Sequence, residues 1–253
     1  MKLKSILILA GIFAIFTLMA QEPPRMTPEM TQVWEPVPPI VTPGAACATA
    51  GTAPSDAIIL FDGSSLAAWR NSRGGDATWD IRDGAVYVNR EAGDIETRQH
   101  FESFQMFIEW RIPVDVQGSC QGRGNSGIFI QNRYELQILD SYNNTTYVNG
   151  QAGSIYKQTP PLVNAMRPPG EWNTFNIIYT APTFRADGSF RTPPMITVFH
   201  NDVLIHDNTI IQGTTEWIGL PQVRPHGPGP IRLQMHGSMN SPVSFRNIWI
   251  REL

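Results

Sequence analysis

The sequence has little cysteine and little net charge, and it lacks the common catalytic motifs. Two cysteines in 253 residues, Cys47 and Cys120, are too few for a disulfide framework, although they can pair in an oxidising compartment. A formal net charge of −3 gives no electrostatic reason to bind nucleic acid. No G-x-S-x-G, H-E-x-x-H or phosphate-binding loop occurs. Asp202, His206 and Asp207 match no standard metal-ligand spacing, so we expect neither a metal nor a cofactor.

Long apolar runs are also scarce, and the exception lies at the N-terminus. Lys2 and Lys4 precede an apolar stretch that ends at Ala20, just before polar Gln21. The stretch is about 15 residues long, shorter than the roughly 20 that a membrane-spanning helix needs. This pattern is typical of a secretory signal peptide over residues 1–20. We therefore expect a periplasmic or secreted mature protein with no membrane span; a retained N-terminal anchor is the alternative.

Residues 21–54 are rich in proline and show neither a helical nor a strand period. Proline fixes φ and removes a backbone donor, so this segment is expected to be extended. One interpretation is a disordered linker. The other is an arm that lies across the domain and is held by Trp34 and Val37.

Residues 55–253 alternate short β-branched and aromatic runs with turn clusters, and no stretch has an apolar period of 3.6. Such a pattern predicts an all-β sandwich or barrel in one domain. Arg82-Asp83-Gly84-Ala85 and His200-Asn201-Asp202-Val203 are predicted hairpin turns. The predicted strands are Ala57–Leu60, Thr78–Arg82, Ala85–Val88, Phe104–Ile112, Ser126–Gln131, Tyr134–Leu139, Asn173–Thr180, Met195–His200, Val203–Asp207, Ile231–His236 and Val243–Arg251.

Three of these strands have polar residues on one side and apolar residues on the other. Successive side chains of a strand point to opposite faces, which separates core from open face. The residues predicted in the core are Trp110, Leu136, Ile138, Leu233 and Trp249. Those predicted on open faces are Glu109, Arg111, Glu135, Gln137, Arg232, Gln234 and His236. Such side chains offer the donors and acceptors that sugar hydroxyls need, although an ordinary solvated face is the alternative.

Three further features bear on carbohydrate chemistry. The E-x-Q-x-x-D spacing from Glu135 to Asp140 resembles the E-x-D-x-x-E strand of laminarinase-like β-glucanases, which pair two acids about 5–5.5 Å apart. Gln137 cannot ionise, and this departure weakens the glucanase interpretation. Lys157, in the loop Gly153–Gln158, is either a surface lysine or an electrophile near the proposed face. Trp217 lies in a loop and could be a sugar-stacking platform.

Several blocks of the chain together resemble the 3-keto-disaccharide hydrolase family, over roughly Ala57 to Leu253. The blocks are Leu60–Trp69, Phe107–Ile112, Gly124–Phe129, Tyr134–Tyr142, Gly153–Gln158, Gly170–Asn173 and Phe245–Ile250. The resemblance implies a concanavalin A-like jelly-roll sandwich of two antiparallel sheets. It also implies an exported enzyme that cleaves oxidised glycosides, with carbohydrate as its partner.

Such a reaction needs a base, a group that stabilises an enolate, and an acid for the leaving group. Among the residues above, Glu135 is our candidate base and His236 the candidate acid or second base. Lys157 or Arg111 could stabilise the enolate. The residues expected to orient the substrate are Glu109, Gln137, Asp140 and Gln234, beside the platform Trp217. A non-catalytic carbohydrate-binding module and a conventional β-glucanase stay as alternatives.

Overall fold

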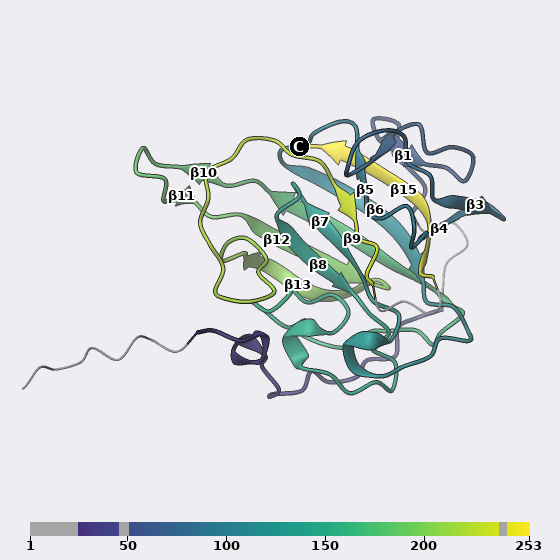
Figure 1. Ribbon diagram of the computed structural model, residues 1–253, viewed down its shortest axis with the longest axis horizontal. Coiled ribbons are helices and arrows are strands. Elements are labelled where there is room, and N and C mark those ends of the chain that lie inside the picture. Colours follow the sequence, from purple (N-terminus) through teal and green to yellow (C-terminus); the bar gives the residue numbers. More distant parts are fainter. Residues whose placement is uncertain (1–24, 46–50, 238–241) are drawn as a thin grey trace, which may run out of the picture.

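The computed structural model describes residues 25–45, 51–237 and 242–253. Two antiparallel β-sheets pack face to face as a sandwich, and loops gather at its ends (Figure 1). The predicted all-β sandwich is therefore confirmed. In the described part of the chain, no helix is both long enough and apolar enough to cross a membrane.

The larger sheet has eight strands in the order β13-β12-β9-β6-β15-β4-β3, and β1 also pairs with β15. Every pairing within it is antiparallel. Its strands are β1 (Ile58–Phe61), β3 (Asp80–Arg82), β4 (Ala85–Tyr87), β6 (Phe104–Arg111), β9 (Trp172–Thr180), β12 (Met195–His200), β13 (Val203–Ile210) and β15 (Ser244–Glu252).

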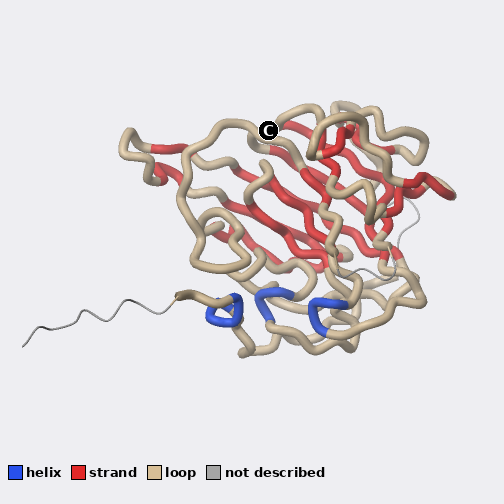
Figure 2. Tube along the Cα trace, viewed as in Figure 1, coloured by secondary structure: helices blue, strands red, loops and turns tan. Residues whose placement is uncertain are grey.

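The smaller sheet has five strands in the order β2-β5-β14-β7-β8. They are β2 (Trp69–Asn71), β5 (Ile95–Thr97), β14 (Arg232–Leu233), β7 (Ser126–Ile130) and β8 (Tyr134–Ile138). A separate hairpin joins β10 (Thr183–Phe184) to β11 (Phe190–Thr192). Three short 3₁₀ helices, η1 (Pro28–Thr31), η2 (Cys120–Gly122) and η3 (Val148–Gly150), lie at one end of the sandwich (Figure 2).

Both predicted hairpin turns are present and have the backbone that such turns need. Asp83 and Gly84 have φ of 51° and 71°, and Asn201 and Asp202 have φ of 52° and 65°. Two successive residues with positive φ give a turn whose twist matches that of the flanking strands. The turns thus connect β3 to β4 and β12 to β13.

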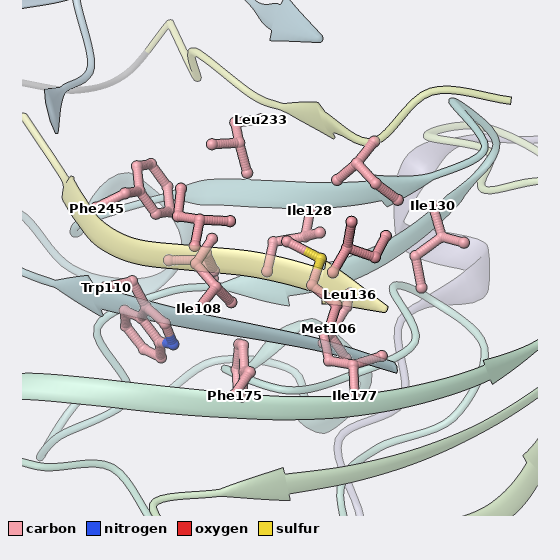
Figure 3. Packing of buried hydrophobic residues seen from close by; sticks show 14 of the residues in the cluster. Met106, Ile108, Trp110, Ile128, Ile130, Leu136, Phe175, Ile177, Leu233 and Phe245 are labelled. Atoms are coloured by element: carbon pink, nitrogen blue, oxygen red, sulfur yellow. The ribbon is translucent and has the colours of Figure 1, made fainter. Parts of the chain in front are cut away.

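The core lies between the two sheets and contains the residues predicted from alternation. Trp110, Leu136, Ile138 and Leu233 are fully or almost fully buried in one hydrophobic cluster. Figure 3 shows Trp110 beside Phe175, and their ring centroids are 5.3 Å apart. Trp249 is buried too, but its ring stacks on Phe107, on the other side of β6. Trp249 is therefore buried as predicted but lies outside the cluster between the sheets, since β15 carries a register irregularity between residues 246 and 249.

The proline-rich residues 25–45 lie against the domain as an extended arm. The buried side chain of Asn149 accepts from the Val33 amide at 3.0 Å and donates to the Thr31 carbonyl at 2.9 Å. Trp34 packs edge-on against Tyr147, with ring centroids 6.1 Å apart. Val37 is largely exposed and does not anchor the arm. The Asn149 side chain, together with the Val148 amide that donates to the Val33 carbonyl at 2.7 Å, therefore holds the arm near η3.

Two predictions fall on residues outside the described part of the chain. The expected signal peptide, residues 1–20, is one of them. Cys47, the proposed partner of Cys120, is the other. Cys120 itself carries a free thiol, with its Sγ 3.3 Å from Thr146 Oγ1.

Candidate functional site

A cavity of about 320 Å³ opens on the outer face of the five-stranded sheet, above β7, β8 and the chain that follows β14. Polar and aromatic side chains line it together, as is usual for a small-molecule site. They are Asn125, Phe129, Glu135, Gln137, Tyr156, Thr215, Trp217, Gln234 and His236. Four predicted site residues on two strand segments, Glu135, Gln137, Gln234 and His236, are thus brought together with Trp217.

The register of β7 against β8 keeps the floor of the cavity open. Gly127 lies opposite Gln137, and its carbonyl accepts from the Gln234 amide at 3.0 Å. A glycine therefore separates the two glutamines. A Cβ atom at position 127 would lie 2.4 Å from Glu135 Oε1. The absence of a side chain at Gly127 thus makes the space that the Glu135 carboxyl occupies.

Glu135 is a buried acid, although sequence alternation placed it on an open face. Every residue of β8 is buried, and Glu135 is only 5 % exposed. Burial raises the pKa of Glu135 to about 8, while the nearby Arg232 charge lowers it and Asp94 adds to the rise. A carboxyl with such a pKa can take up or release a proton near neutral pH.

The amides that line the cavity are fixed by a network with their nitrogen atoms turned to the wall. Gln137 Nε2 donates to Gln121 Oε1 at 3.0 Å, and Asn125 Nδ2 donates to the Gln121 carbonyl at 2.9 Å. Among the described residues, the buried Oε1 atoms of Gln137 and Gln234 have no hydrogen-bond partner. Buried acceptors without partners are costly, so a hydroxyl donor of a ligand that reaches either oxygen would be favoured.

His236 and Tyr156 add two titratable groups to the lining. Burial lowers the pKa of His236, so the neutral imidazole predominates at neutral pH. Burial also raises the pKa of Tyr156, whose hydroxyl lies 2.7 Å from the Tyr147 hydroxyl. The cavity therefore contains one carboxyl, one imidazole and one phenol, all mainly uncharged at neutral pH.

The loop 213–222 forms one wall of the cavity. Thr215 Oγ1 accepts from the Glu135 amide at 2.9 Å, and the Thr215 amide donates to the Arg133 carbonyl at 2.9 Å. Trp217, two residues further on, is 67 % exposed. An exposed indole at the rim of a polar cavity offers a flat apolar surface on which a sugar ring can stack.

Glu109 and Arg111 do not join this site, and their predicted place beside Glu135 is wrong. Both lie on β6, in the eight-stranded sheet, whose outer face is on the opposite side of the sandwich. Glu109 Oε2 accepts from Arg246 Nε at 2.7 Å, and Arg111 donates to the Tyr87 hydroxyl at 3.0 Å. Alternation within a strand identifies two faces but does not say in which sheet the strand lies.

Asp140 and Lys157 are close in sequence to the site, but neither lines the cavity. Asp140 is fully buried and forms an ion pair with Arg123 at 2.7 Å, because the chain leaves the sheet after Ile138. Lys157 Nζ donates to the Pro28 and Trp217 carbonyls, both at 2.7 Å. The structure therefore gives no support to Asp140 as a substrate ligand or to Lys157 as an electrophile.

Sequence reasoning assigned no substrate contact to four residues that line the cavity. Asn125 and Phe129 flank the apolar positions of β7, and alternation around Ile128 could have identified Phe129. Tyr156 and Thr215 come from loops, and no local pattern shows where a loop returns to a sheet. Among the residues that the structure describes, no group of three or more His, Cys, Asp or Glu could hold a metal ion.

Comparison with known proteins agrees with this fold. A 3-keto-disaccharide hydrolase of Bacteroides thetaiotaomicron is 27 % identical over 158 residues, which cover 48 % of this chain and 51 % of that protein. The chain thus spans about half the length of this curated relative.

Solved structures from Parabacteroides distasonis ATCC 8503 extend the comparison. One, described as a candidate glycosyl hydrolase, is 61 % identical, has a TM-score of 0.80, and is matched over 90 % of this chain and 97 % of its own. A second, described in the same way, is 20 % identical with a TM-score of 0.57, covers 78 % of this chain and 94 % of its own, and supports the fold. The family model for the 3-keto-alpha-glucoside-1,2-lyase-like domain matches residues 56–251. This chain therefore belongs to the 3-keto-alpha-glucoside-1,2-lyase-like domain family, whose members and neighbours indicate a carbohydrate-active protein of glycosyl hydrolase type.

Proposed function

We propose that the protein cleaves 3-keto-glycosides by base-initiated elimination followed by hydration. The observation that carries the proposal is the set of ionisable groups in the cavity: Glu135 is the one carboxyl among the described lining residues. A standard glycosidase needs two carboxyls, about 5–5.5 Å or about 6.5–9.5 Å apart. Elimination needs one base and one acid. The names of the matched family and of the Bacteroides relative support the same substrate class.

The chemistry follows from a ketone at C3 of the sugar. The ketone acidifies the proton on C2, and a base removes it to give an enolate. The electron pair then forms the C1–C2 double bond while the C1–O bond breaks, and the leaving alkoxide takes a proton. Water adds its hydroxyl to C1 and a proton to C2, so the net change is hydrolysis of the glycosidic bond.

Glu135 is the proposed base, and His236 is the proposed acid for the leaving group. The Oε1 atoms of Gln137 and Gln234 would accept from sugar hydroxyls, and Trp217 would stack on the ring. Glu135 acts as a base only when ionised and His236 as an acid only when protonated. Because burial raises the pKa of Glu135 to about 8 and lowers that of His236, kcat/KM should be highest between the two pKa values and fall above about pH 8. A kcat/KM that stays level above pH 8 would show that protonated His236 is not needed as the acid.

A conventional glucanase needs a second catalytic acid, and Asp140 cannot fill that role because it is fully buried and paired with Arg123. A non-catalytic carbohydrate-binding module is favoured by the exposed indole of Trp217. The two remaining candidates predict different roles for Glu135. A binding module would retain its affinity for sugar after Glu135 is replaced by Gln, and it would cleave no glycoside.

The deciding experiment compares p-nitrophenyl α-glucoside with its 3-keto form, each also prepared with deuterium at C2. We expect cleavage of the 3-keto form alone, with loss of the label to solvent or a slowed reaction, because elimination must break the C2–H bond. Equal cleavage of both forms with full retention of deuterium would reject elimination and return the glucanase interpretation. Binding of either compound without cleavage would establish a binding module.

We also propose that the protein works in the periplasm or outside the cell. The basic start and the short apolar run of residues 1–20 support this location. N-terminal sequencing of the exported protein is expected to find the chain beginning near Gln21. Exported material that starts at Met1 would reject cleavage.

A further inference from the structure

Lys157 has an unusual position in both sequence and structure. It is the single lysine after Lys4, in a chain whose other basic residues are arginines and histidines. Its backbone is in the left-handed region, with φ of 57°, and its amide donates to the Asn149 carbonyl at 2.7 Å. Left-handed backbone is unfavourable for a residue other than glycine, so surrounding contacts must stabilise this conformation.

The ammonium group of Lys157 joins two segments that are distant in sequence. Nζ donates to the Pro28 carbonyl in the arm and to the Trp217 carbonyl in the loop 213–222, both at 2.7 Å. The residue is 8 % exposed, and burial lowers its pKa. Hydrogen bonds with a charged donor are roughly twice as strong as neutral ones, so both acceptors are held firmly.

The residue that accepts the Lys157 amide also binds the arm. Asn149, whose carbonyl receives the Lys157 amide, binds the arm at Thr31 and Val33 through its buried side chain. Lys157 and Asn149 therefore form one junction between the arm and the wall of the cavity. On the cavity side, the Trp217 side chain is mostly exposed, so its position depends on how its backbone is held.

We propose that Lys157 is a positioning residue that holds Trp217 at the rim of the cavity by tying its backbone to the N-terminal arm. This inference rests on the proposed function, since Trp217 is taken to be the sugar platform. The arm thereby supports the binding site without lining the cavity. Lys157 thus has a role that does not involve the reacting atoms.

The test uses the mature protein with Lys157→Met, Lys157→Arg, Trp217→Ala and the Lys157→Met/Trp217→Ala double variant. On the 3-keto p-nitrophenyl α-glucoside, Lys157→Met should raise KM roughly tenfold, because a loop without this hydrogen bond no longer holds Trp217 where the sugar stacks, while kcat changes little. Lys157→Arg keeps the charge and the donors and should restore most of the affinity. In the Trp217→Ala background, Lys157→Met should have almost no further effect.

Two readouts separate this inference from the proposed function. Amide hydrogen exchange across residues 213–222 should become faster in Lys157→Met and stay slow in Lys157→Arg, whether or not any sugar is cleaved. Sodium borohydride added during turnover should leave no adduct on Lys157. Unchanged exchange in the loop, additive effects of the two substitutions, or a borohydride-trapped sugar on Lys157 would each overturn the proposal. If Lys157→Met does not fold, exchange and KM in Lys157→Gln decide, because this variant removes the charge but keeps a polar side chain. Faster exchange with a raised KM there supports the inference, and wild-type values oppose it.

Discussion

The two outer faces of the sandwich carry similar residue types but use them in different ways. On the eight-stranded sheet, Glu109 accepts from Arg246 and from Asn247, and the Arg246 guanidinium lies 4.2 Å from the Trp172 ring centroid. On the five-stranded sheet, the Oε1 atoms of Gln137 and Gln234 have no partner among the described residues. Polar groups are thus paired on one face and still available on the other.

Whether the polar groups have partners says more about function than the residue types on the two faces. A paired, half-exposed charge such as that of Arg246 stabilises the fold slightly and has little left to offer a ligand. A buried acceptor without a partner lowers stability unless a ligand supplies a donor. The face that carries the cavity is therefore the one on which the fold has left polar groups unsatisfied.

The largest effect is expected when the acid on each outer face is replaced. Glu135→Gln keeps the size of the side chain but removes its basic form, so turnover of the 3-keto glycoside should fall about 10²- to 10⁴-fold. Affinity for the unoxidised glucoside should change little. Glu109→Gln, the matched control, should leave turnover unchanged. Steady-state kinetics of the two variants measure the contrast, and equal losses in both would remove the functional distinction between the faces.

The next largest effect should come from the floor of the cavity. In Gly127→Ala, the new methyl group would lie 2.4 Å from Glu135 Oε1 and must displace it. A shift of about 1 Å in a catalytic group can cost about 10²-fold in rate, so kcat should fall by a factor of this order. Gly122→Ala is the control, because a Cβ there meets nothing within 4 Å. A kcat for Gly127→Ala equal to that of the control would show that the carboxyl position is not critical.

Local pattern was sufficient to predict most of the strands that form the core and the site. Alternation identified Phe104–Arg111 and Tyr134–Ile138 almost to the residue, because side-chain direction has a period of two in any strand. The strands β2 and β5 were missed, since each is three residues long and too short to show a period. Pairing partners depend on contacts distant in sequence, so Glu109 was assigned to the wrong face.

The site could be predicted mainly where strands build it, and Trp217 is the one predicted loop residue of the described lining that sequence analysis named. Glu135, Gln137 and Gln234 follow from alternation, and the structure brings them to one cavity. Thr215 and the junction at Lys157 depend on loops that return across the sheet, and sequence spacing does not encode those paths. Asp140 shows the converse, because its spacing from Glu135 suggested a shared face while the chain had already left the sheet.

A smaller effect is expected in the pH dependence of stability, and it concerns Glu135 on the face that carries the cavity. Burial raises the pKa of Glu135 from 4.5 to about 8, so between these values the folded protein holds a proton that the unfolded chain has released. The stability from this proton is complete below pH 4.5 and is lost as pH rises through 8. Glu135→Gln titrates in neither state, so its Tm relative to the wild type should increase from pH 4.5 to pH 8. A Tm difference that is constant across this range would show that the carboxyl is not held in a raised-pKa environment.

The smallest effects are expected on the outer face of the eight-stranded sheet, where Glu109 and Arg246 form an ion pair. Replacing either partner should lower stability, but by unequal amounts. Glu109 is buried, whereas the Arg246 side chain is 43 % exposed and can be hydrated when its partner is removed. Glu109→Gln should therefore lower the free energy of unfolding by about 0.5–1 kcal/mol. Arg246→Met leaves the buried Glu109 charge with Asn247 as its remaining side-chain donor among the described residues, and should cost about 1–3 kcal/mol. Urea unfolding measures both values, and kcat should stay at the wild-type level in each variant. The ion pair and the cavity lie on opposite sides of the core, so loss of the half-exposed pair alone should not change kcat. A tenfold fall in kcat in either variant, without unfolding, would therefore mean that this face also contributes to the reaction.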